Sequence, residues 1–115
     1  MIKFIKKMIH DKKEYKNQME RKEKLPEDYK FVFDKIQEYI WRFASGDGSE
    51  MLKVQGDLLD LFEYSALEGK KVLEVTGDDV IGFSDELLRG TKKWTDRYAE
   101  RLNKEIINNA KEDNK

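Results

Sequence analysis

The chain has 115 residues, a length that suits one hydrophobic core, and 41% of them are charged, so its elements must carry heavily solvated faces. It contains no cysteine, which excludes disulfide bonds, thiolate metal sites and cysteine nucleophiles. No stretch of about 18 apolar residues predicts a transmembrane helix, and the N-terminal residues lack the form of a signal peptide, so we expect a cytoplasmic protein.

The first predicted element is a basic amphipathic helix over residues 1–24. This segment has nine basic and four acidic residues, a net charge of +5, whereas residues 25–115 carry a net charge of −6. Apolar residues recur along one face at steps of three, four or seven, and Lys12 interrupts that face. Three interpretations stay open: a helix docked on its own domain, a coiled-coil-like contact with a second chain, and contact with an anionic surface.

Two longer helices are predicted next. The second begins near Pro26, whose missing amide costs nothing in a first turn, and it ends before a glycine-rich loop. The third is expected over residues 49–68, because Asp47 begins a capping-box pattern and Gly69 takes the position after the helix. Gly56 inside this helix weakens its propensity by roughly 1 kcal/mol relative to alanine, so we expect it to let another backbone approach closely, the alternative being a tolerated defect.

The sharpest local signal is a predicted cap ahead of a fourth helix over residues 77–89. The Thr76 hydroxyl is expected to accept a hydrogen bond from the backbone N–H of Asp79. The Asp79 carboxylate would in turn accept one from the backbone N–H of Thr76. Val75 and Val80 would flank this cap as a hydrophobic staple. We therefore predict a structural cap made of Val75, Thr76, Asp79 and Val80.

The last predicted helix places four large apolar residues on one row at four-residue spacing. These residues are Trp94, Tyr98, Leu102 and Ile106. Residues 111–115 should fray. The sequence shows no strand-like alternation and no internal repeat, so it predicts an all-α fold: a single domain over residues 1–115, built as a bundle of four to five helices with short connections.

Part of the sequence resembles a known family. Residues 75–80 read VTGDDV, residues 83–88 read FSDELL, and Trp94 and residues 102–106 (LNKEI) follow. The chain is similar to the small bacterial helical proteins catalogued as domain of unknown function 1048, most clearly over residues 50–107. The resemblance implies a compact all-helical protein of unassigned activity, whose genes often neighbour small winged-helix repressors. It implies no catalytic residues.

The sequence lacks the metal-ligand motifs that a ferritin-like di-iron protein would need. The family is sometimes labelled DNA-binding and ferritin-like, but a di-iron bundle requires two Glu-x-x-His motifs, and the single histidine, His10, has Lys7 three residues before it. Asp57, Asp60 and Glu63 have a spacing that could serve a hard cation, although such a row is usually a solvated helix face. We therefore expect no enzyme activity and no metal or other cofactor.

The sequence alone does not identify a biochemical role, and two hypotheses follow from its surfaces. The first is a non-enzymatic helical interaction protein, such as an accessory to a transcriptional regulator, that binds a protein partner or a second copy through exposed apolar residues. Its candidate contact residues are Met1, Ile2, Ile5, Met8, Ile9 and Trp41. The alternative is a nucleic-acid-binding protein that uses the lysine-rich helix, although a pI of about 5.9 is low for that role. Its candidate anion contacts are Lys3, Lys6, Lys7, Lys12 and Lys13.

Overall fold

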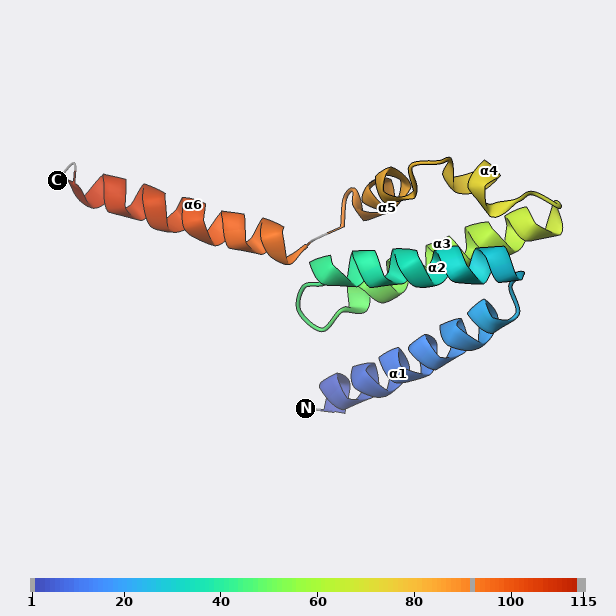
Figure 1. The fold of residues 1–115 in the computed structure, drawn as a ribbon. Coiled ribbons are helices and arrows are strands. Elements are labelled where there is room, and N and C mark those ends of the chain that lie inside the picture. Colours follow the sequence, from blue (N-terminus) through green and yellow to red (C-terminus); the bar gives the residue numbers. More distant parts are fainter. Residues whose placement is uncertain (1, 92, 114–115) are drawn as a thin grey trace.

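The computed structural model describes residues 2–91 and 93–113, and within them the chain is helical apart from short connections (Figure 1). These residues form six α-helices, one 3₁₀ helix and no strand. The bounds are Ile2–Glu23 (α1), Glu27–Ile40 (α2), Trp41–Phe43 (η1), Ser49–Leu67 (α3), Val72–Thr76 (α4), Val80–Leu88 (α5) and Trp94–Asp113 (α6). The predicted all-α class is confirmed. None of the described helices combines the length and the apolar character needed to cross a membrane.

Helices α2 and α3 form the centre of a bundle and lie side by side, with α4 and α5 packed beside them (Figure 1). The Tyr29 and Phe62 rings meet edge to face with centroids 5.1 Å apart, and the Tyr29 hydroxyl donates to the Lys70 carbonyl at 2.7 Å. Apolar residues at helical spacing face this core from both helices. The buried apolar residues are Leu25, Tyr29, Phe33, Ile36, Ile40, Met51, Val54, Leu58, Leu59, Phe62, Val72 and Leu88.

Helix α1 packs against α3, and its C-terminal half makes the deep contacts. Gln18 is 1% exposed, and Leu25, just after the helix, is buried in the core. The Arg21 guanidinium binds the carboxylates of Asp60 and Glu63 on α3 at 2.6 and 2.5 Å. Part of the basic N-terminal helix is therefore docked on its own domain, the first of the three interpretations considered for it.

The ends of α3 follow the predicted local chemistry. Asp47 accepts the backbone amide of Ser49 at 3.0 Å, where the helix begins. Gly69 follows the helix with φ +75°, a conformation that glycine adopts without strain. The Lys70 amide donates to the Ser65 carbonyl at 3.1 Å, and the Gly69 amide donates to the Ala66 carbonyl at 3.0 Å. Together these bonds form a Schellman motif that turns the chain back toward α2.

The cap predicted at Thr76 is wrong in position. Thr76 ends α4, and its hydroxyl donates to the Gly77 carbonyl at 2.8 Å. Gly77, with φ +75°, then separates two short helices. Asp79 caps α5 instead, because its carboxylate accepts the amide three residues later at 2.9 Å. The fourth predicted helix consequently begins three residues later than expected, and Val75 and Val80 pack on the core from two different helices.

Helix α6 projects from the bundle, an arrangement that the sequence spacing did not predict (Figure 1). The radius of gyration is 18.5 Å, whereas about 13 Å is expected for a compact chain of this length. Gly90, with φ +81°, turns the chain after α5. At the first turn of α6 the Trp94 indole N–H donates to the Arg42 carbonyl at 2.9 Å, which attaches the helix to the end of the bundle.

Helix α6 also ends later than predicted. Lys111 and Glu112 are helical, and the helix runs to Asp113, although fraying was expected from residue 111. A lysine in the last turn is favourable beside the negative end of the helix dipole. Residues 114–115, the rest of the predicted tail, lie outside the described residues.

Candidate interaction surfaces

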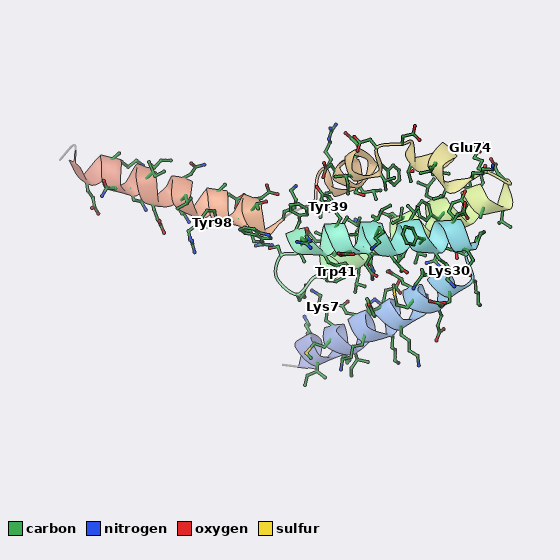
Figure 2. All side chains as sticks on the ribbon, in the orientation of Figure 1. Lys7, Lys30, Tyr39, Trp41, Glu74 and Tyr98 are labelled. Atoms are coloured by element: carbon green, nitrogen blue, oxygen red, sulfur yellow. The ribbon has the colours of Figure 1, made fainter. Side chains whose placement is uncertain are left out.

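An uncovered apolar face runs along α6. We define the α6 face as Trp94, Tyr98, Leu102 and Ile106, the row at four-residue spacing. Trp94 and Tyr98 are 49% and 48% exposed, and their rings meet edge to face with centroids 6.3 Å apart. Ile106 is 64% exposed. Figure 2 shows Tyr98 on the projecting helix, well away from the bundle. The face is therefore open to a partner along most of its length.

Two opposite charges border the α6 face. The Arg101 guanidinium lies 5.2 Å from the centre of the Tyr98 ring, a cation–π distance, and 3.9 Å from the Glu105 carboxylate. Both charged side chains are 65% exposed. An ion pair this exposed adds little to the stability of the helix itself, so both groups are available to a second surface.

A second uncovered apolar face lies on the N-terminal half of α1. Ile5, Met8 and Ile9 are each about half exposed, and we call these three residues the α1 face. Met1 lies outside the described residues, and so does the side chain of Ile2, whose backbone begins α1. The contact role predicted for these residues stays a prediction.

Trp41 is not the freely exposed aromatic that the sequence suggested. It is half-buried, its ring covers Gly48, and its indole N–H donates to the Gln55 side chain (Trp41 is labelled in Figure 2). The ring lines a mainly apolar hollow of about 470 Å³ between α1 and the start of α3. The residues around that hollow are Lys7, Met8, Asp11, Lys12, Tyr15, Trp41, Asp47 and Leu52.

A chain of buried amides continues inward from Trp41, and sequence reasoning missed it. Gln55 donates to the Gln18 side-chain oxygen at 3.1 Å, and Gln18 donates to the Leu52 carbonyl at 2.9 Å. A Cβ on Gly56 would stand 3.3 Å from the Gln18 amide nitrogen, so this glycine makes room for a side chain and not for the backbone we expected. The available signal was a glutamine at a core-facing position, but glutamine is common on solvated faces.

Lys7 is engaged within the chain. Its ammonium lies 2.5 Å from the Asp47 carboxylate (Lys7 is labelled in Figure 2). This contact raises the pKa of Lys7 and, together with the Ser49 amide, holds the pKa of Asp47 well below its usual range. The other predicted anion contacts are exposed and form no ion pair within the described residues: Lys3, Lys6, Lys12 and Lys13.

The acidic row considered for a cation serves another purpose. Asp60 and Glu63 bind Arg21, and the hydrogen bonds to Glu63 and Asp60 raise the pKa of that guanidinium. Asp57 is exposed on the outer side of α3. Throughout residues 2–91 and 93–113, no three His, Asp or Glu side chains are grouped so that they could hold a metal ion.

Comparison with known proteins identifies the family. A family model described as "Protein of unknown function (DUF1048)" matches residues 6–107. The chain belongs to the DUF1048 family. It is 53% identical to a DUF1048 protein from Bacillus cereus, whose crystal structure is described as a left-handed superhelix fold, with a TM-score of 0.59. That comparison covers 64% of this chain and 90% of the other. None of the curated proteins matches the chain.

The DUF1048 match extends from the first turns of α1 into α6. It ends at Ile107, one residue beyond the last member of the α6 face. Helix α6 is therefore part of the DUF1048 domain as the family model defines it, even though it projects from the bundle. Both candidate faces lie largely inside the matched region.

Proposed function

We propose that this DUF1048 protein is a non-enzymatic helical interaction protein that binds a protein partner or a second copy of itself, for example as an accessory to a transcriptional regulator. The observation that carries the proposal is the α6 face. A 20-residue helix projects from the bundle with Trp94, Tyr98 and Ile106 each about half exposed or more.

Physical chemistry favours a partner for such a helix. Most of the stability of a helix in a protein comes from packing its apolar face and not from intrinsic helix propensity. Tryptophan and tyrosine also contribute strongly to protein interfaces, because they bury a large area with few rotatable bonds. A partner that covers the α6 face would stabilise the helix and remove both aromatic rings from water.

The α1 face supports the same role from the other end of the chain. Ile5, Met8 and Ile9 lie on the part of α1 that precedes its deep contacts with α3. This face must be tested by point substitution, because deletion of residues 1–20 would also remove Gln18 and its buried hydrogen bonds.

Affinity purification from cells that express the protein with two different tags, followed by mass spectrometry, tests the proposal, because recovery of the second tag reports a second copy. The α6 variant carries Tyr98→Ser and Ile106→Ser. Its matched control is Phe31→Ser, because Phe31 is 64% exposed on α2. We expect wild type and control to recover the same partner and the α6 variant to lose it. Equal recovery by all three proteins, or none by wild type, contradicts the proposal.

The alternative proposal is nucleic-acid binding through α1. It is supported by the exposed lysines of that helix, of which Lys3, Lys6, Lys12 and Lys13 form no ion pair within the described chain. Fluorescence anisotropy with duplex DNA from low to physiological salt tests it. Binding that weakens steeply with salt would support this alternative, because phosphate contacts release counterions. Absence of binding at the lowest salt would eliminate it.

A further inference from the structure

We infer that the α6 face binds α6 of a second copy of this chain, with the two helices antiparallel across a two-fold axis at Leu102. The inference rests on the proposed function, because it names the partner of the same face. A two-fold interface requires a surface that is complementary to itself, and two-fold homodimers are the commonest oligomers. The α6 face meets that requirement in side-chain size and in charge.

Side-chain sizes along α6 are complementary under this symmetry. When Leu102 meets Leu102 of the second copy, each residue before Leu102 faces the residue that lies equally far after it. Tyr98 then lies level with Ile106 of the second copy, and the two Leu102 side chains meet at the axis. A large aromatic ring is thus level with a smaller aliphatic side chain. Such alternation lets the side chains of two packed helices interdigitate.

The bordering charges are complementary as well. Arg101 and Glu105 lie on the same edge of the α6 face, one helical turn apart. In an antiparallel two-fold pair, that edge meets the same edge of the second copy. Each Arg101 then comes within reach of two carboxylates, its own Glu105 and Glu105 of the second copy. The four charges sum to zero and favour this register over shifted ones.

The shape of the molecule permits this pairing. Figure 1 shows α6 projecting from the bundle, so a second helix can approach it beyond its first turn, where Trp94 contacts the bundle. The contact from Tyr98 to Ile106 is about 12 Å long at 1.5 Å per residue. One helix pair of this length is a small interface, so we expect a dimer with a dissociation constant that is roughly micromolar and depends visibly on protein concentration.

Sedimentation equilibrium of the full chain, from about 1 μM to about 1 mM, tests the inference because this range brackets a micromolar constant. Wild type should pass from monomer to dimer. Leu102→Asp should raise the dissociation constant by at least about a hundredfold, because it brings two carboxylates together at the axis.

A charge-reversal series distinguishes this interface from unspecific association. Glu105→Arg and Arg101→Glu should each raise the dissociation constant by about tenfold, because each single reversal gathers four like charges. The double reversal should return it to within about threefold of wild type. Glu38→Arg breaks an equally exposed ion pair on α2 and should leave it unchanged. Circular dichroism checks that every variant is folded.

The outcomes separate the two proposals. A wild-type monomer at the highest concentration, a dimer that Leu102→Asp leaves intact, or a double reversal no better than the single ones overturns the pairing of α6 with itself. If the purification experiment still shows a partner that is lost with Tyr98→Ser and Ile106→Ser, the proposed function stands with a different protein as partner. If neither the dimer nor a purified partner is found, both the pairing of α6 and the proposed function are rejected.

Discussion

The bundle and helix α6 are built from the same kind of amphipathic sequence. The apolar faces of the bundle helices are buried against other helices of the chain, whereas the α6 face is exposed. In α3, Leu58 and Phe62 are 0% exposed, whereas Ile106 and Ile107 in α6 are 64% and 51% exposed. The turn after α3 folds the chain back onto α2, but the segment after α5 leads α6 away (Figure 1). Helical periodicity therefore identifies the apolar face of each helix. The connecting segments determine whether that face packs against another helix of the same chain.

Amide hydrogen exchange should separate the two regions most widely. Amides in the middle of α3 should be slowed by about a thousandfold or more, because their exchange requires unfolding of the bundle. Amides of α6 should be slowed by only about tenfold in a dilute, monomeric sample, because an unsupported helix opens locally. Exchange measured by mass spectrometry or NMR checks this difference. Equal protection in a monomer would mean that α6 packs on its own bundle.

Truncation of one apolar side chain in each region should have unequal effects on stability. Phe62→Ala removes a fully buried ring that packs against Tyr29 and should lower the free energy of unfolding by about 3–5 kcal/mol. Ile106→Ala should change it by no more than about 0.5 kcal/mol in the monomer. Urea denaturation at low protein concentration measures both. Similar losses from the two substitutions would contradict the contrast between bundle and projecting helix.

Much of the bundle could be predicted because local chemistry sets helix ends. The third helix was expected over residues 49–68 and runs from Ser49 to Leu67, since Asp47 and Gly69 mark its ends. The error at the fourth helix has a local cause too. Thr76 and Asp79 are both good capping residues. The turn at Gly77, between them, leaves Asp79 and not Thr76 as the N-cap of α5.

The candidate surfaces were less predictable because they depend on contacts between distant residues. Lys7 and Asp47 are 40 positions apart, and no spacing rule pairs them. Trp41 is half-buried because it packs against the core, where Gln55 on the following helix accepts its indole N–H. The row that begins at Trp94 was recognised correctly as one helical face, but its exposure depends on where α6 points, which the connection after α5 determines.

The buried amides give the bundle a polar feature that α6 lacks, and Gln55→Met should reveal its energetic role. The substitution nearly conserves volume but leaves the Trp41 indole N–H and the Gln18 side-chain oxygen without this partner. We expect a loss of about 1–3 kcal/mol in the free energy of unfolding. Gln37→Met is the control and should cost less than about 0.5 kcal/mol, since among the described residues the Gln37 side chain makes only a 3.9 Å contact to a methionine sulfur.

The smallest effect should come from the exposed contact that holds the N-terminal half of α1 to the loop before α3. Lys7 and the Ser49 amide lower the pKa of Asp47 in the folded protein, whereas the unfolded carboxyl titrates near its ordinary value of about 4. Between these two values the unfolded state binds more protons, so this contribution to stability is complete above the unfolded pKa and disappears as pH falls through the folded one.

Urea denaturation of wild type and Asp47→Asn from pH 7 downward tests this contribution. The unfolding midpoints should differ slightly at pH 7 and converge in acid, because the asparagine does not titrate. Lys7→Met should reproduce most of the effect, since the lysine is the larger cause of the shift. A difference that stays constant down to strong acid would show that the pair does not hold α1 to the loop in solution. The α1 face would then be as loosely attached to the bundle as α6 is, and the contrast would lie between α2–α5 and both chain ends.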